Sequence, residues 1–148
     1  ENLAIAKSWL ASSDEYNLLV NGTAITAFPV YYQNDLALLR QSLRIVQAGT
    51  EVAEVKGKDL IPAHGLAMSR LLKTSVFPTE ALTYEQAIAY LRKEAIVLPP
   101  SVPKGYVLVT YKEIPLGFVK NIGNRANNLY PQEWRIRSGY LPDDIRTL

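Results

Sequence analysis

The chain has 148 residues, a net charge of +2 and a hydrophobic share of 48%, and it contains no cysteine. This length suits one compact domain or two small ones, and the composition is that of a folded globular protein. Without cysteine there can be no disulfide, thiolate nucleophile or cysteine-bound zinc, and without an apolar run near about 20 residues we expect no membrane partner and a cytoplasmic protein.

The first half of the sequence alternates short helical and β patterns. Residues 2–10 have helical spacing, and the β-rich runs 16–22 and 23–29 meet at Asn21-Gly22, a dipeptide typical of tight hairpins. Further along, the patterns predict a helix from 34 or 35 to 42, strands at 43–49 and 51–57, and a helix over about 62–72. Glu51 and Glu54 lie three apart on one of these strands, so we expect them on opposite faces and not as a carboxylate pair.

The second half begins after a break in the pattern. Residues 73–82 contain Pro78 and small polar residues, which indicates a linker. Thr83 and Gln86 form a capping-box motif for a helix to about residue 94. Residues 106–112 and 116–122 predict a β-hairpin with its turn at 113–115. Because strands come in hairpin pairs between lone helices, the fold class is α+β, with two small domains at 1–75 and 76–148.

Positive charge is concentrated in residues 104–137. This segment has six basic residues and two acidic ones, a net charge of +4, whereas residues 1–103 have nine basic and ten acidic residues, a net charge of −1. RNA binding requires cations for phosphates, aromatic rings for stacking and amides for base edges, and this segment has all three. The segment therefore predicts an RNA-binding module, with these side chains gathered on one exposed surface.

The expected RNA contacts centre on residues 121–128, which contain four asparagines, a glycine and an arginine. An asparagine-rich turn is the alternative, because asparagine tolerates left-handed backbone, but the neighbouring cations favour RNA. The expected phosphate ligands are Lys120, Arg125, Arg135 and Arg137, and Lys112 is a further expected RNA-binding residue. The expected contacts to sugars or bases are Asn121, Asn124, Asn128 and Tyr130.

Aromatic residues near these cations have two interpretations. Tyr130 and Trp134 could offer a stacking platform for an unpaired base. For Trp134 we favour a place in the core, because large aromatic residues of small domains are mostly buried. Tyr111 and Tyr130 are left open between the two.

The sequence offers no catalytic or metal site. His64 is the single histidine and has no cysteine or carboxylate pair near it, so we expect it to be structural. No glycine-rich phosphate-binding motif is present.

Several motifs resemble a known family. Pro115-Leu116-Gly117, Lys120, Asn128, Tyr130-Pro131 and Trp134-Arg135 together resemble the closing motif of Sun-family RNA cytosine-5 methyltransferases of the bacterial RsmF type. The resemblance implies that this half is a PUA-like RNA-binding domain, a mixed β-barrel or sheet with one capping helix. Upstream, Ala48-Gly49, Glu54-Val55-Lys56, Pro62-Ala63-His64 and Leu66-Ala67 look like the small domain that precedes it in the family.

The family's catalytic domain binds S-adenosylmethionine and uses a cysteine nucleophile. Because this chain has no cysteine and starts at Glu1 without methionine, we expect a non-catalytic C-terminal portion of a longer methyltransferase, with no cofactor of its own. The implied partners are ribosomal RNA and the protein's own N-terminal methyltransferase domain. The alternative is a structural module that packs on that domain or on a ribosomal protein through apolar positions such as Phe77 and Ile145.

Overall fold

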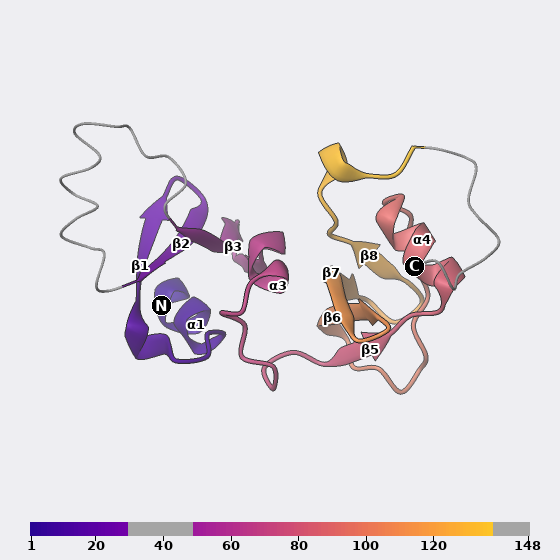
Figure 1. Ribbon diagram of the computed structural model, residues 1–148, viewed down its shortest axis with the longest axis horizontal. Coiled ribbons are helices and arrows are strands. Elements are labelled where there is room, and N and C mark those ends of the chain that lie inside the picture. The colour runs from indigo at the N-terminus through magenta and orange to yellow at the C-terminus, as the bar shows by residue number, and fades with distance from the viewer. Residues whose placement is uncertain (30–48, 138–148) are drawn as a thin grey trace. The chain divides into compact units, whose positions relative to one another are not determined.

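A computed structural model describes residues 1–29 and 49–137 of the chain (Figure 1). It divides into two compact units, Glu1–Val76 and Phe77–Leu148, called unit 1 and unit 2. Each has a four-stranded sheet and short helices, which confirms the α+β fold class. Within the described ranges, no helix is long and apolar enough to cross a bilayer. The predicted helix of 34–42, nearly all of the predicted strand 43–49, and Ile145 lie outside the described residues.

Unit 1 is an antiparallel sheet with strands in chain order. Its elements are α1 (Asn2–Ser8), a short 3-10 helix (Ser13–Glu15), β1 (Tyr16–Asn21), β2 (Ala24–Pro29), β3 (Thr50–Lys56), β4 (Asp59–Pro62) and α3 (His64–Met68). The segment after α1 pairs with the end of the unit, because the Ala11 N–H donates to the Leu71 carbonyl (2.7 Å) and the Lys73 N–H to the Trp9 carbonyl (2.8 Å). These bonds tie the first and last parts of the unit together.

The predicted first hairpin is confirmed, with its turn moved by one residue. Asn21 is the last residue of β1 and pairs with Ala24, so the turn consists of Gly22 and Thr23. Gly22 has a φ of 63°, which glycine adopts without strain. The helix predicted over about 62–72 is shorter in the structure, where α3 spans His64–Met68. Pro62 ends β4 opposite Ala53 and does not open the helix.

A bulge in unit 1 overturns the expectation for Glu51 and Glu54. The register shifts between Ile25 and Thr26, so that Val52 and Ala53 are both buried. Glu51 is opposite Thr26 and Glu54 is opposite Ala24, and these two positions of β2 lie on the same face. The two carboxylates therefore share a face, and the Coulomb interaction with Glu54 adds to desolvation in raising the pKa of Glu51.

Unit 2 is a mixed sheet in the strand order β5-β6-β7-β8, with β5 parallel to β6 and the other neighbours antiparallel. Its elements are β5 (Thr79–Ala81), α4 (Tyr84–Leu91), β6 (Gly105–Tyr111), β7 (Ile114–Asn121), β8 (Ala126–Asn128) and a second 3-10 helix, η3 (Gln132–Trp134). The expectation was a mixed β-barrel or sheet. The described strands form an open mixed sheet and no closed barrel. β5 lies inside the predicted linker and β8 inside the predicted loop, and both are only three residues long.

Helix α4 covers one face of this sheet, and the side chains between the helix and the sheet form the core of unit 2. The capping box is confirmed, because the Gln86 N–H donates to Thr83 Oγ1 (3.2 Å) and the Thr83 N–H to Gln86 Oε1 (2.9 Å). Tyr90 is fully buried, and its hydroxyl donates to the Phe118 carbonyl (3.0 Å). Around Tyr90 pack aliphatic side chains of the strands and of the segment after the helix: Ile96, Leu98, Val107, Val109, Val119 and Ala126.

The apolar position proposed for protein contact at Phe77 is not exposed. Phe77 is half-buried, and its ring packs edge-on against Phe118 with 5.0 Å between ring centroids. That expectation is therefore wrong for Phe77.

Candidate nucleic-acid interface

The hairpin of β6 and β7 carries cations at both ends. Its turn consists of Lys112 and Glu113, which have φ angles of 48° and 69°, and the ammonium of Lys112 lies 5.6 Å from the centre of the Tyr111 ring. The predicted turn at 113–115 is displaced because Pro115 belongs to β7, where the register shifts. Lys120 lies at the other end of the hairpin, and seven residues of β6 extend about 23 Å, so Lys112 and Lys120 are not brought together.

At the open end of the hairpin, three strands place different chemical groups in one row. Lys120 on β7 is paired with Tyr106 on β6 and with Asn127 on β8. Residues opposite each other in an antiparallel sheet point to the same side. The neighbouring positions Val107, Val119 and Ala126 belong to the core under α4, so the row lies on the face of the sheet away from that helix. The Lys120 ammonium lies 5.6 Å from the centre of the Tyr106 ring.

The turn from β7 to β8 adds exposed polar groups at this end. The Ile122 N–H donates to the Arg125 carbonyl (3.0 Å), and Asn124 and Arg125 are exposed. Lys104 passes over the turn, because a Cβ on Gly123 would lie 3.1 Å from Lys104 Cε. We call this set the hairpin base; its members are Lys104, Tyr106, Lys120, Asn124, Arg125 and Asn127.

Asn121, a predicted base contact, is used inside the protein. Its side chain is 4% exposed, and Nδ2 donates to the carbonyls of Val102 (3.2 Å) and Pro103 (3.0 Å). Oδ1 accepts from the Gly123 N–H (3.1 Å). An amide has two donor hydrogens, so both are engaged in holding the loop before β6 against the end of β7.

Asn128, another predicted base contact, closes the C-terminal end of α4. Its Nδ2 donates to the carbonyls of Tyr90 (2.7 Å) and Glu94 (2.8 Å), and its Oδ1 accepts from the Tyr130 N–H (2.8 Å). The Tyr90 carbonyl also accepts from the Lys93 N–H (2.9 Å), so the amide adds a second bond there and gives the Glu94 carbonyl beyond the helix a partner. Asn128 therefore joins β8 to the helix.

The helix end itself explains why α4 stops three residues before the predicted position. Lys93 has a left-handed φ of 67°, and the Glu94 N–H returns to the Ala89 carbonyl (3.0 Å), a Schellman arrangement. The Lys93 ammonium donates to the Asn128 carbonyl (2.9 Å). Desolvation lowers the pKa of Lys93, and the nearby charge of Glu133 opposes that shift.

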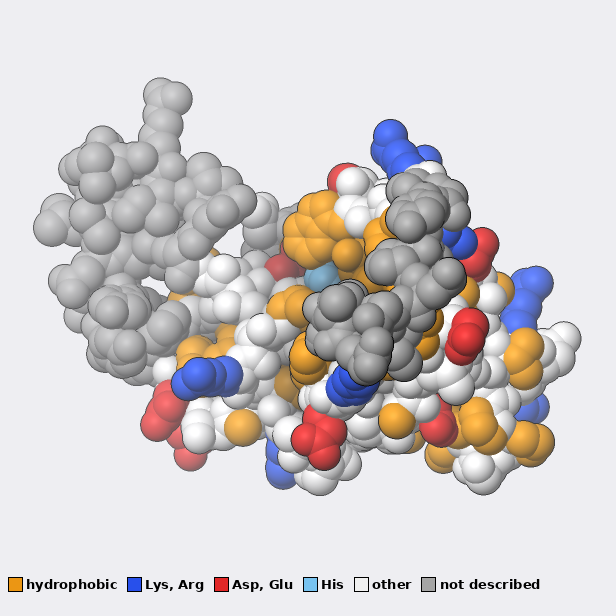
Figure 2. All heavy atoms as spheres, turned by 45° about the vertical axis from the view of Figure 1, so that its right-hand side comes forward, with side chains coloured by type: hydrophobic (Ala, Val, Ile, Leu, Met, Phe, Trp, Pro, Cys, Tyr) orange, Lys and Arg blue, Asp and Glu red, His pale blue; other side chains and the backbone are white. Residues whose placement is uncertain are grey.

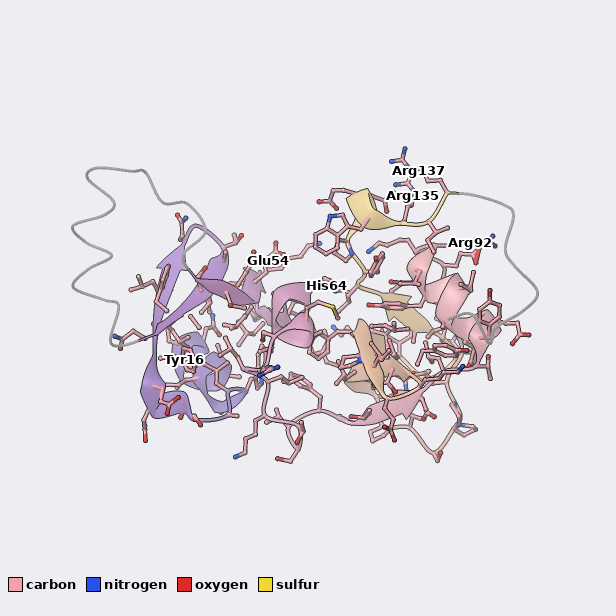
Figure 3. All side chains as sticks on the ribbon, in the orientation of Figure 1. Tyr16, Glu54, His64, Arg92, Arg135 and Arg137 are labelled. Atoms are coloured by element: carbon pink, nitrogen blue, oxygen red, sulfur yellow. The ribbon has the colours of Figure 1, made fainter. Side chains whose placement is uncertain are left out.

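The segment after β8 holds a second group of cations. The Ile136 N–H donates to the Leu91 carbonyl (2.8 Å), which anchors the segment at the end of α4. Figure 3 shows Arg135 and Arg137 close to each other, on the same side of unit 2 as Arg92. The Arg135 guanidinium donates to the Gln132 carbonyl (3.1 Å), and Arg137 is exposed.

The two aromatic residues of this segment differ in exposure. Tyr130 is half-buried, with its ring edge-on to Tyr90 at 5.4 Å. Trp134 is 60% exposed, so the prediction that it fills the core is wrong. Its place on η3, outside the layer between α4 and the sheet, is the physical reason.

The cations of the described residues thus stand in separate groups. On the face shown in Figure 2, small clusters of Lys and Arg side chains are separated by hydrophobic and acidic ones. In unit 2 the chain places Lys104, Lys120 and Arg125 at the hairpin base, Arg92, Arg135 and Arg137 on one side of the unit, Lys93 at the end of α4 and Lys112 in the hairpin turn. Sequence reasoning missed Tyr106 and Asn127 as neighbours of Lys120, because a strand's partners are known only once its turn and register are fixed.

Comparison with known proteins agrees with the resemblance. Residues 77–136 match the family model of the methyltransferase RsmF PUA domain. Over 138 residues, 93% of this chain, it is 29% identical to the ribosomal RNA small subunit methyltransferase F of Enterobacter sp. (strain 638). Over 99 residues, 67% of this chain, it is 28% identical to the protein of the same name from Klebsiella pneumoniae (strain 342).

The matched stretches make up 27% and 20% of these two relatives, so the chain spans about a quarter of their length. The predicted resemblance to RsmF-type ribosomal RNA methyltransferases is confirmed, and it includes a match of residues 77–136 of unit 2 to the RsmF PUA domain.

Proposed function

We propose that this chain is the RNA-binding region of a ribosomal RNA cytosine-5 methyltransferase, and that it positions ribosomal RNA for a catalytic domain outside these residues. The observation that carries the proposal is that the match to the RsmF PUA domain, residues 77–136, includes nearly all of the segment 104–137 in which positive charge is concentrated. In this proposal, residues 1–75 are a small domain that precedes an RNA-binding domain at 76–148. The protein acts in the cytoplasm, where its ribosomal RNA partner is made.

The chain's part in the reaction is binding and not chemistry. The sequence has no cysteine, so it cannot supply the nucleophile that the family uses. Among the described residues, no group of histidine and acidic side chains could hold a metal ion. S-adenosylmethionine and its pocket then belong to the N-terminal methyltransferase domain, the chain's expected partner.

The proposed RNA contacts are the predicted residues, sorted by what their side chains already do. Lys120, Arg125, Arg135 and Arg137 would neutralise phosphates, and Asn124 and Tyr130 would contact sugars or bases. Lys112 lies at the opposite end of the β6–β7 hairpin from Lys120, so we leave it out of the proposed contacts. Asn121 and Asn128 have both amide hydrogens engaged, so their contribution is to hold the loops that carry the other residues.

The test measures binding of a small-subunit ribosomal RNA fragment to the 148-residue chain at rising salt. Affinity should fall with salt, with a slope on the order of −0.7 per neutralised phosphate of a single strand. Reversing two charges with Lys120→Glu and Arg125→Glu should weaken binding, whereas the same reversal at exposed Lys56 and Lys58 of unit 1 should have little effect. No binding, or a flat salt response, would contradict the proposal.

A second candidate function, a structural or protein-interaction module, has one observation in its favour. β1 is an edge strand of unit 1, and it carries Leu19 and Val20 with 41% and 56% of their surfaces exposed. Adjacent exposed apolar side chains on an edge strand are typical of a contact surface. This function predicts that the chain still co-purifies with the methyltransferase domain after its basic residues are neutralised, and that Val20→Lys disrupts the association.

A further inference from the structure

We propose that the hairpin base binds an unpaired RNA strand, and that Tyr106 positions the Lys120 ammonium to receive one of its phosphates. This inference rests on the proposed RNA-binding function. It locates RNA binding at the hairpin base and names single-stranded RNA as the ligand. Tyr106, Lys104 and Asn127 then join Lys120, Asn124 and Arg125 as RNA-binding residues.

The first step is the geometry of the row across the sheet. Tyr106, Lys120 and Asn127 are direct neighbours on three adjacent strands. Neighbouring strands lie about 4.8 Å apart, so the three side chains span about 10 Å. An aromatic ring, a cation and an amide are thus held in a fixed order on a rigid sheet.

The second step is the local charge. Lys104, Lys120 and Arg125 all lie at the hairpin base. Glu113 and Glu133 are the only acidic residues between positions 95 and 137 of the sequence. Glu113 lies in the distant turn and Glu133 on η3, so the segments 104–106 and 120–127 that form the hairpin base contain basic residues and no acidic ones.

The third step identifies the strand as unpaired. The deep major groove of an RNA duplex is closed to side chains, so amides read base edges mainly where bases are unstacked. Asn124 and Asn127 are exposed, and Asn127 lies beside Lys120. A row that offers amides beside a cation therefore fits a single strand, with its phosphates on the lysines and its bases toward the amides.

The fourth step concerns Tyr106. A lysine ammonium over a tyrosine ring is attracted by the negative face of the ring, which restricts an otherwise flexible side chain. The Lys120 ammonium lies 5.6 Å from the centre of that ring. Tyr106 is thus a positioning residue for the phosphate ligand, and a phenylalanine ring should serve the same purpose.

The hairpin supplies its own matched control. Lys112 lies 5.6 Å from the centre of the Tyr111 ring at the opposite end, so it shares the charge and the ring contact of Lys120 but has no neighbouring amide on β8. We compare Lys120→Gln with Lys112→Gln in the 148-residue chain. The probes are oligouridine, which forms no stable duplex with itself, and a blunt RNA duplex of the same length.

We expect Lys120→Gln to weaken oligouridine binding roughly fivefold and to reduce the salt slope by about 0.7, the value for one phosphate, while Lys112→Gln changes neither. Tyr106→Phe should bind as the parent chain does, and Tyr106→Leu should weaken binding several-fold. The backbone amide NMR spectrum of Tyr106→Leu should show that the variant is folded, which separates a loss of binding from unfolding. The parent chain should prefer oligouridine over the duplex.

Equal losses for the two lysine variants, or none for Lys120→Gln, would overturn the placement. Tighter binding of the duplex would overturn the substrate class. If the chain binds the ribosomal RNA fragment with a steep salt dependence and the hairpin-base variants have no effect, the inference fails while the proposed function stands. If the parent chain binds no RNA, both fail.

Discussion

Units 1 and 2 each build a four-stranded sheet, yet the strand register groups different side chains on each of them. In unit 1, a bulge opposite Ile25 and Thr26 brings Glu51 and Glu54 to one face. In unit 2, the hairpin register brings Lys120 between Tyr106 and Asn127. One residue of register decides in each case which side chains are neighbours: two carboxylates share a face of one sheet, and a lysine lies between an aromatic ring and an amide on the other.

Unit 2 also joins its elements by side chains that reach far along the sequence. Tyr90 bonds to a residue 28 positions away, and Asn128 bonds to residues 38 and 34 positions away. These bonds fix the helix, the end of the sheet and the following loop relative to one another. A preformed surface is what RNA binding needs, because ordering a flexible one reduces affinity.

The largest expected effect tests whether units 1 and 2 unfold independently of each other. Tyr90→Ala removes a fully buried ring and should lower the free energy of unfolding of unit 2 by about 3–5 kcal/mol. Each unit holds one tryptophan, Trp9 and Trp134, so their indole N–H signals follow the units separately in a denaturant titration. The Trp9 transition should not move.

The control for this change is Tyr90→Phe, which keeps the ring and removes only the hydroxyl bond to Phe118. It should lower the stability of unit 2 by about 1 kcal/mol. A shift of both tryptophan signals together in Tyr90→Ala would show that the two units unfold as one.

The next effect concerns the amide that closes α4. Asn128→Ala leaves the carbonyls of Tyr90 and Glu94 and the Tyr130 N–H without this partner, so unit 2 should lose about 1–3 kcal/mol in guanidinium unfolding. Asn124→Ala, at an exposed position of the nearby turn, should stay within about 0.5 kcal/mol of the parent chain. Similar losses for the two variants would mean that Asn128 does not hold the helix end.

A smaller effect, in the stabilising direction, is expected at the turn of the β6–β7 hairpin. Lys112 and Glu113 both have positive φ, which Asn-Gly adopts more readily in a two-residue turn. Lys112→Asn with Glu113→Gly should raise the free energy of unfolding of unit 2 by about 1 kcal/mol, measured by thermal unfolding. RNA affinity should be unchanged, and a loss of affinity would place Lys112 in the binding site.

The smallest effect concerns Glu51 and Glu54, which share a face of the sheet in unit 1. The pKa of Glu51 is raised, first by desolvation and second by Glu54. Glu54→Gln should therefore lower the pKa of Glu51 part of the way toward its ordinary value of 4.5, as followed by NMR titration of the carboxyl carbon. The control Glu15→Gln, outside the sheet, should leave that pKa where it is.

The sign of the accompanying stability change follows from proton binding. A raised folded-state pKa means that folded unit 1 holds its proton on Glu51 more tightly than the unfolded chain does, so this contribution is present below pH 4.5 and is lost as pH rises through the folded pKa. Removing the repulsion should thus stabilise unit 1 at neutral pH and not at low pH. A gain that is equal at both would point to another cause.

Much of the fold was predictable from local chemistry, and the site was predictable only in part. The capping box at Thr83, the hairpin at Gly22 and the β6–β7 pair follow from residue patterns that act over a few positions. Strands β5 and β8 were missed because three residues carry too short a pattern to read. Pro115 misled the placement of the second turn, since a proline is also tolerated at a strand bulge.

Tertiary structure decides which of the predicted RNA contacts have side-chain groups already engaged inside the protein. Arg125 is exposed and Lys120 is half-buried, but the sequence could not show that the amides of Asn121 and Asn128 would be used by carbonyls 18 to 38 residues away. Trp134 looked like a core residue because nothing in the sequence marks η3 as lying outside the helix-sheet layer. Whether such a side chain is engaged inside the protein depends on which buried polar groups still lack a hydrogen-bond partner once the helix and sheet have packed.

The most direct test of the central claim is an NMR map of the 148-residue chain titrated with oligouridine. The largest shifts of backbone amide signals should fall at residues 104–106 and 120–127, with little change at the Lys112–Glu113 turn or in unit 1. Largest shifts at that turn, on unit 1, or evenly over all cations would contradict the claim that the hairpin base is where this chain binds RNA.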